Sequence, residues 1–223
     1  LSSAALPSTL REIGGSAFSG CSALAAVDVP AGADPGDRAF SGCTSPPRVS
    51  LPEGVTAGVR HEVDEGWDEW YGSYDVFEGC TALASVELPG SLLAVPDGMF
   101  DGCTALRSVR LGEGIERVGA GASVDGAFDG CTALASVEVP SALREIGRCA
   151  FYGCSALAAA ALPAGLREIG PYAFYGCSAL AEIVLPASVE SVGGYAFQGC
   201  APAVPVALPA ALSGIGERAF EFG

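Results

Sequence analysis

The chain of 223 residues is long enough for one large domain, and half of its residues are hydrophobic. Its formal net charge of −15, from 26 acidic and 11 basic residues, argues against nucleic acid as a partner, because phosphates attract basic surfaces. The apolar residues occur in short runs, and none reaches the ~18 consecutive apolar residues that a membrane span needs.

The chain is a repeat from its first residues onward. "LSSAALP" at residues 1–7 aligns with "LASVELP" at residues 83–89, so the sequence starts inside a repeat. Eight times a phenylalanine is followed by any residue, a glycine and a cysteine, at Phe18, Phe40, Phe77, Phe100, Phe128, Phe151, Phe174 and Phe197. We therefore expect a single array of about nine 23-residue coils over residues 1–223, as a fragment of a longer array.

Each repeat predicts two elements, which the copies at residues 131–199 show most clearly. The segment V-x-L in the pattern C-x-x-L-x-x-V-x-L-P predicts a short strand, because alternate residues of a strand face the same side. Proline ends this strand, since it donates no hydrogen bond to a sheet. Leu143 and Ile146, three residues apart, predict a helical turn on the opposite side. The glycine before each cysteine permits the positive φ at which the coil bends back.

A single coil cannot bury its own apolar side chains, whereas stacked coils share a continuous core. We therefore expect a right-handed superhelix with a parallel β-sheet on its concave side and short turns or helical turns on its convex side. The pattern resembles the BspA-type (treponemal) leucine-rich repeat, with "LPSTLREIGGSAFSGC" at residues 6–21 as the best local match. This resemblance implies a leucine-rich-repeat solenoid of a kind often found at the cell surface or secreted, in adhesion or recognition modules.

Three segments depart from the repeat. Residues 31–38 lack the expected leucine and isoleucine, so we expect that coil to pack poorly. About fourteen residues are inserted between Cys43 and Phe77, at about residues 60–75. Residues 119–125 carry a shorter insertion, rich in glycine and alanine, which we expect to be a flexible bulge. Insertions in solenoids lie on the surface and are frequent binding elements.

The larger insertion contains the only histidine and both tryptophans of the chain. One interpretation is a solvated acidic loop whose aromatic side chains fold back on the coil beneath. A second is a recognition loop, because tryptophan and tyrosine are enriched at interface hot spots. A third, calcium binding, is weakened by a spacing of acidic residues that does not match the EF-hand loop. The candidate binding residues are His61, Trp67, Asp68, Trp70, Tyr71 and Tyr74.

A second candidate surface is the concave sheet, where the middle residue of each V-x-L segment points outward. These residues are Asp28, Ser50, Glu87, Arg110, Glu138, Ala161, Val184 and Ala207. The first half of this row is polar and the second half is apolar, which indicates either a contact face or drift toward alanine. Curved solenoids usually bind along the concave face, so the candidate residues are Glu87, Arg110, Glu138 and Val184.

The sequence offers little for chemistry. Eight of the nine cysteines close repeats and predict a column of buried thiols that act as small hydrophobic side chains. A disulfide between Cys149 and Cys154 is an alternative for that pair. Zinc would need paired cysteines and histidines, and His61 has no serine or cysteine near it in the sequence to activate. We predict no catalytic residue, no cofactor and no metal.

The function that we predict is a non-enzymatic binding or adhesion scaffold that recognises a protein, or a glycan, at its surface. The alternative is a structural repeat spacer in a larger surface or cytoskeletal protein. Neither nucleic acid nor a membrane span is expected among the partners of this chain.

Overall fold

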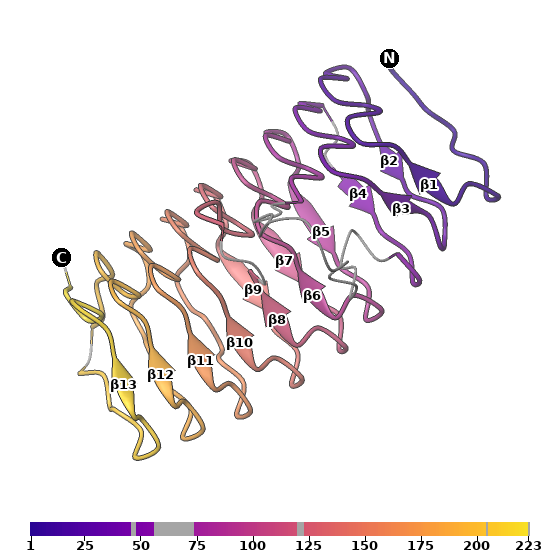
Figure 1. Ribbon diagram of the computed structural model, residues 1–223. Coiled ribbons are helices and arrows are strands. Elements are labelled where there is room, and N and C mark those ends of the chain that lie inside the picture. Colours follow the sequence, from indigo (N-terminus) through magenta and orange to yellow (C-terminus); the bar gives the residue numbers. More distant parts are fainter. Residues whose placement is uncertain (46–47, 56–73, 120–122, 204, 223) are drawn as a thin grey trace, which may run out of the picture.

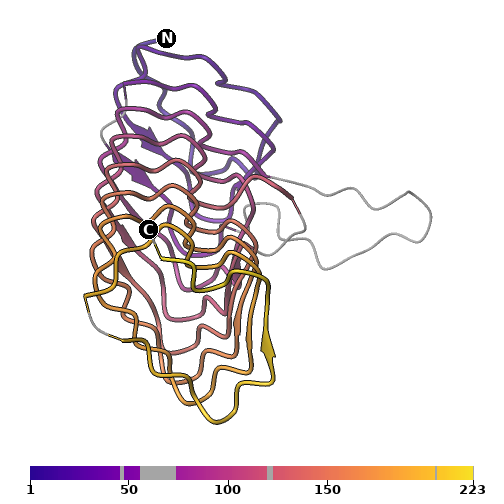
Figure 2. The same cartoon turned by 90° about the vertical axis from the view of Figure 1, so that its left-hand side faces the viewer.

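A computed structural model describes residues 1–45, 48–55, 74–119, 123–203 and 205–222 of the chain. In these ranges the chain winds into a stack of coils with thirteen short strands and no helix (Figure 1). The two termini lie at opposite ends of the stack, and the coils follow one another with similar outlines (Figure 2). The predicted solenoid of stacked coils is therefore confirmed.

The first sheet is formed by the V-x-L segments, which were predicted to be strands. Its five parallel strands are, in spatial order, β2 (Val27–Asp28), β4 (Arg48–Ser50), β5 (Ser85–Glu87), β7 (Ser108–Arg110) and β9 (Ser136–Glu138). The register aligns one buried valine per strand, at Val27, Val49, Val86, Val109 and Val137. After β9 the first sheet continues, among the described residues, as a bridge between Ala159 and Glu182. The run of alanines there lacks the β-branched side chains that favour strands.

A second sheet lies where the helical turn was expected, so that expectation was wrong. Its six parallel strands are β6 (Ala94–Val95), β8 (Arg117–Val118), β10 (Glu145–Ile146), β11 (Glu168–Ile169), β12 (Ser191–Val192) and β13 (Gly214–Ile215). The Gly147 amide donates to the Val118 carbonyl of the neighbouring coil at 2.7 Å. Because neighbouring coils offer backbone partners in register, extended backbone satisfies its hydrogen bonds between coils and needs no helical turn.

The coil at residues 31–38 is better packed than its sequence suggests, and the expectation of poor packing was wrong. Strand β3 (Asp34–Pro35) pairs in parallel with β1 (Glu12–Ile13) in a separate two-stranded sheet. Ala33 and Pro35 are buried there. Pairing between coils uses backbone atoms, so it tolerates the loss of leucine and isoleucine, and the proline ring fills the position facing Ile13.

The core contains a continuous column of phenylalanine rings. Nine rings stack from coil to coil, with centroids 5.2–5.6 Å apart and planes within 2–13° of parallel. They are Phe18, Phe40, Phe77, Phe100, Phe128, Phe151, Phe174, Phe197 and Phe220. At these separations aromatic pairs attract one another beyond their burial of apolar area.

The segment around each core phenylalanine, here called the closing turn, forms a third ladder of hydrogen bonds. The Gly79 amide donates to the Asp101 carbonyl at 2.7 Å, and the same bond recurs in every closing turn up to Gly199 and Glu221. The glycine before each of the eight repeat cysteines has a φ of 64–76°, as predicted. The coils around β7, β8 and β9 are thus bonded to their neighbours on three sides.

The thiol column is confirmed for seven cysteines, which are buried: Cys43, Cys80, Cys103, Cys131, Cys154, Cys177 and Cys200. Each of these donates from Sγ to the carbonyl of the closing phenylalanine in the preceding coil, at 3.2–3.3 Å. Cys21 is partly exposed. All nine cysteines are free, so the alternative of a Cys149–Cys154 disulfide is wrong.

Candidate functional site

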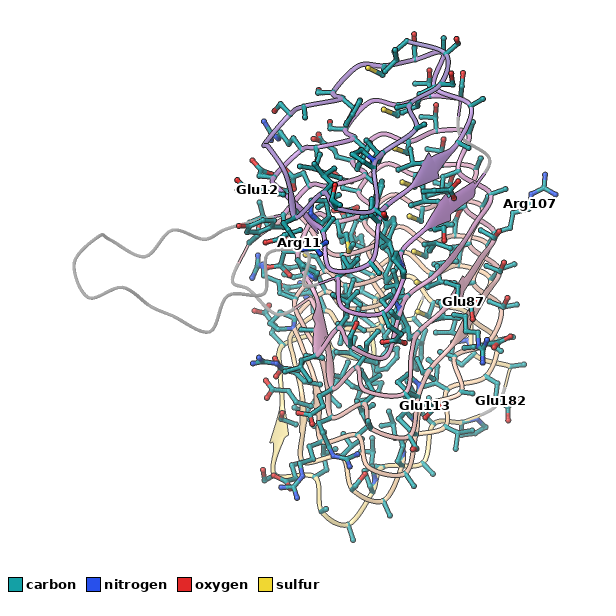
Figure 3. The ribbon with its side chains drawn as sticks, turned by 90° about the vertical axis from the view of Figure 1, so that its right-hand side faces the viewer. Arg11, Glu12, Glu87, Arg107, Glu113 and Glu182 are labelled. Atoms are coloured by element: carbon teal, nitrogen blue, oxygen red, sulfur yellow. The ribbon has the colours of Figure 1, made fainter. Side chains whose placement is uncertain are left out.

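Three of the candidate residues on the concave sheet form one row. Here the outward side of the first sheet and of the segments that continue it is called the strand face. The register of β5, β7 and β9 places Glu87, Arg110 and Glu138 side by side. Arg110 Nη1 contacts Glu87 Oε1, and Arg110 Nε lies 3.6 Å from Glu138 Oε2. All three side chains are exposed, and Glu87 is seen pointing outward in Figure 3. Exposed ion pairs contribute little to stability, so this row stays available to a partner.

The row lies over a shallow depression of about 390 Å³. Three aligned serines, Ser85, Ser108 and Ser136, line it together with the three charged residues. Hydroxyl groups both donate and accept hydrogen bonds, so this half of the strand face suits polar contacts.

The other half of the strand face is apolar. Val184 is 62% exposed and lines a depression of about 520 Å³. Ala161, Leu162 and Pro186 line the same depression, with Glu182 on its wall. The polar-to-apolar change that the sequence shows along this row is therefore present on the surface as two adjoining depressions.

Most of the candidate loop falls outside the residues that the structure describes: His61, Trp67, Asp68, Trp70 and Tyr71. Tyr74 is described and is half-buried, with its side chain packed against the core. Its backbone amide donates to the Asp97 carbonyl at 2.9 Å. Tyr74 thus belongs to the fixed end of the insertion.

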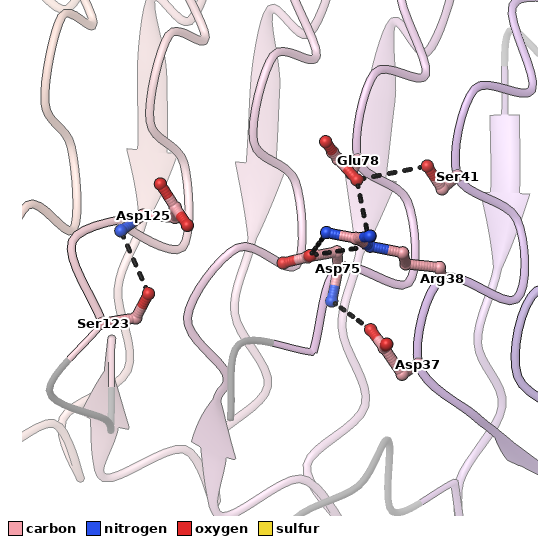
Figure 4. Close-up of polar contacts among 7 residues, drawn as sticks. All are labelled: Asp37, Arg38, Ser41, Asp75, Glu78, Ser123 and Asp125. Atoms are coloured by element: carbon pink, nitrogen blue, oxygen red, sulfur yellow. Dashed lines mark hydrogen bonds and ion pairs between the residues drawn. The ribbon is translucent and has the colours of Figure 1, made fainter. Parts of the chain in front are cut away.

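The end of the insertion is held by an ion pair. Arg38 donates to Oδ2 of Asp75 from Nη2 at 2.9 Å and from Nε at 3.1 Å (Figure 4). The Asp75 backbone amide donates to Asp37 Oδ1 at 3.3 Å, and Glu78 lies 3.6 Å from Arg38. The hydrogen bond to Asp75 is the main reason why the pKa of Arg38 is raised above its ordinary value. Asp75 is only 5% exposed, so this contact fixes where the insertion rejoins the stack.

Both insertions meet at Asp97, which is 2% exposed. Its carbonyl accepts from Tyr74, and its carboxylate Oδ2 accepts from the Ser123 amide at 3.1 Å. Ser123 lies at the end of the second insertion, where its hydroxyl also accepts from the Asp125 amide at 3.2 Å (Figure 4). Sequence reasoning missed Asp97 and Arg38, because both stand at variable positions of the repeat pattern.

Sequence reasoning also missed a cluster of tyrosines in the closing turns of three consecutive coils. The rings of Tyr152 and Tyr175 stack with centroids 4.8 Å apart, and those of Tyr172 and Tyr195 stack at 5.0 Å. Tyr172 and Tyr175 are 5.9 Å apart and join the two pairs. The spacing of 23 residues within each pair is the signal that could have revealed it.

Within the ranges given above, no three histidine, cysteine or acidic side chains are grouped as metal ligands would be. The same part of the chain contains no helix that could cross a membrane.

The repeat in the sequence decides the family. The profile described as "BspA type Leucine rich repeat region" matches six copies, over residues 1–58, 72–122 and 124–222. The chain belongs to the BspA-type leucine-rich-repeat family. The resemblance drawn from the closing turns is therefore confirmed, and repeats of this family are typical of protein–protein interaction or adhesion scaffolds.

Solved bacterial structures share the fold of this BspA-type chain. A leucine-rich-repeat protein of T. pallidum (TpLRR) is 34% identical over 59% of this chain and 68% of its own, with a TM-score of 0.51. A leucine-rich-repeat protein of Eubacterium ventriosum is 22% identical over 84% of this chain, with a TM-score of 0.65. The pneumococcal vaccine antigen PcpA is 20% identical over 90%, with a TM-score of 0.51. The chain spans 45% and 47% of the last two. No curated protein sequence matches it.

Proposed function

We propose that this BspA-type chain is a non-enzymatic binding scaffold that recognises a partner protein on its strand face. The observation that carries the proposal is the pair of adjoining depressions, one beneath Glu87, Arg110 and Glu138, the other around Val184. Protein interfaces combine an apolar centre with a polar rim, and this surface offers both on one face.

The charged row supports recognition more than stability. Arg110 lies between two glutamates on neighbouring strands, and all three side chains remain in water. A partner can exchange these ion pairs for its own at small cost to the fold, since exposed pairs contribute at most about 1 kcal/mol. Such charges govern specificity and the association rate more than affinity.

The insertion at residues 60–75 is proposed as a second contact element. The ion pair of Arg38 with Asp75 holds the end of the insertion at the stack. The candidate contact residues are His61, Trp67, Asp68, Trp70 and Tyr71. Tyr74 has a structural part in this proposal, because its side chain packs on the core. The non-enzymatic assignment rests on the repeat family and on the presence of a single histidine in the chain.

The test uses two matched substitutions of exposed valines. Val184→Glu places a charge in the apolar depression, whereas Val124→Glu changes a valine of similar exposure, 65%, outside it. Proteins captured from serum on the immobilised chain are compared by mass spectrometry, with glycan-array binding measured in parallel. We expect Val184→Glu to lose proteins that Val124→Glu retains.

A deletion of residues 61–73 tests the insertion, and it must keep Tyr74 and Asp75 because both hold the stack. We expect it to fold and to capture less protein than the unmodified chain. Equal capture by Val184→Glu and by the unmodified chain contradicts strand-face recognition and supports a structural spacer. Binding to glycans alone contradicts the proposed class of partner.

A further inference from the structure

The tyrosine cluster, Tyr152, Tyr172, Tyr175 and Tyr195, lies on the closing turns and not on the strand face. All four side chains are half-buried, so part of each ring reaches solvent. The cluster contains four of the six tyrosines of the chain. The fold requires no aromatic side chain here, because other coils have Ser16, Arg38 or Arg218 where Tyr172 and Tyr195 stand.

Two of these tyrosines adopt an unfavourable backbone conformation. The φ angles of Tyr172 and Tyr195 are 59° and 61°, in the left-handed region where a Cβ atom is disfavoured. An earlier coil has Gly98 at the equivalent position, with a φ of 70°. Glycine adopts this conformation without steric cost, so the two tyrosines occupy places where a residue without a side chain fits the backbone better. Ser16, Arg38, Cys149 and Arg218 share this conformation in other coils, so it belongs to the repeat, and the repeat does not require tyrosine at the position.

One ring of the cluster already accepts a guanidinium group. The Cζ atom of Arg148 lies 5.3 Å from the centroid of Tyr172, within the range of a cation–π contact. Nε of Arg148 is buried and makes no hydrogen bond to the residues that the structure describes. Each stacked pair of rings has two outer faces, and Arg148 occupies one of them.

Carboxylates lie beside the cluster in the same ladder. The Gly102 amide donates to the Asp129 carbonyl, and the Gly130 amide donates to the Tyr152 carbonyl, both at 2.9 Å. Asp101, Asp129 and Tyr152 therefore follow one another on consecutive coils. Desolvation and repulsion from neighbouring carboxylates raise the pKa of Asp101 and of Asp129 to about 6. An approaching cation relieves that repulsion, whereas an apolar or anionic partner does not.

We propose that the tyrosine cluster binds an arginine-bearing segment of a partner protein, with guanidinium groups on the outer ring faces and Asp129 beside them. Arginine fits better than lysine because its planar guanidinium stacks on aromatic faces. This surface is separate from the strand face, so the inference goes beyond the proposed function and each can fail without the other.

The test measures binding of two fluorescent octapeptides of equal charge, one alternating arginine with serine and one alternating lysine with serine, at 0.15 M salt. Fluorescence polarisation is recorded with the unmodified chain, with the double variant Tyr152→Ser/Tyr175→Ser, and with Tyr152→Phe/Tyr175→Phe. We expect tighter binding of the arginine peptide, a loss of about five-fold or more in the serine variant, and little change in the phenylalanine variant. Melting temperatures show whether the variants fold.

If the chain binds the two peptides equally, the proposal is overturned. It is also overturned if a folded serine variant binds the arginine peptide as tightly as the unmodified chain does. Either result would mean that the net charge of −15 alone attracts the peptides. Absence of binding overturns it as well. Val184→Glu serves as the control on the strand face and is expected to leave peptide binding unchanged within two-fold.

Discussion

Arg38 donates two hydrogen bonds to the carboxylate of Asp75, 37 positions further along the chain. The pair joins the closing turns of two consecutive coils, which lie 37 residues apart in the sequence because the insertion separates them. It thereby fixes the point at which an irregular segment rejoins a regular stack.

Replacing Arg38 tests this contact. We expect Arg38→Met to lower the free energy of unfolding by about 1–2 kcal/mol, because it leaves a buried carboxylate without its charged donor. Arg38 is itself about half exposed, so water screens the pair and keeps the loss at this level. Urea denaturation followed by circular dichroism measures the change.

Arg110→Met is the matched control, because it removes an arginine whose ion pairs are fully on the surface. We expect a change within about 0.5 kcal/mol. Equal losses in the two variants would show that the Arg38–Asp75 pair has no special structural part.

The phenylalanine column predicts that the loss of stability on replacing a phenylalanine depends on its position in the stack. Phe128 is fully buried between Phe100 and Phe151, so Phe128→Ala should cost about 3–5 kcal/mol. Phe220 is half-buried in the last described coil, and Phe220→Ala should cost distinctly less. Thermal melting of both variants checks this order. A reversed order would contradict the packing described.

The thiol column predicts one readily reactive cysteine in the native protein. Burial raises the pKa of Cys80 and of Cys200 to about 12, and that of Cys131 well above its ordinary 9.0. The reactive thiolate is therefore scarce at pH 8, whereas Cys21 is partly exposed. A thiol-reactive dye should label about one cysteine quickly in buffer and nine in denaturant. Cys21→Ser should abolish the fast phase, and rapid labelling of eight native thiols would refute the column.

Asp101 and Asp129 predict a pH dependence of stability. Their pKa of about 6 in the folded chain exceeds the ordinary 3.8, so the folded state binds more protons between these values. Their contribution to stability is therefore present below about pH 4 and is lost as the pH rises through 6. The double variant Asp101→Asn/Asp129→Asn should gain melting temperature relative to the unmodified chain between pH 4.5 and 7.5. A difference in melting temperature between the two proteins that stays constant from pH 4.5 to 7.5 would contradict this.

The features that recur in every coil could be predicted from the sequence. The glycine before each cysteine, the buried valine of each strand and the closing phenylalanine have the same surroundings in every coil, so their spacing predicts their places. The helical turn at Leu143 and Ile146 was wrong because a spacing of three residues also suits a turn followed by a strand. Only the neighbouring coil decides between the two, through hydrogen bonds that no local pattern records.

The candidate site was partly predictable for a related reason. Glu87, Arg110 and Glu138 follow from the alternation of strand side chains, and the structure places them in one row. The bonds that Asp97 makes to Tyr74 and Ser123 join two irregular segments, and irregular segments have no period from which a contact can be inferred.

The ladders of hydrogen bonds between coils also determine how the molecule responds to force. These bonds run from coil to coil, so tension applied between the two ends of the stack loads the bonds of the outermost coil along their length. Coils should then peel away in sequence, each releasing about 80 Å of extended chain for 23 residues. In optical tweezers the chain should lengthen in regular small steps at low force, as an extensible tether does, and a single abrupt rupture would contradict this.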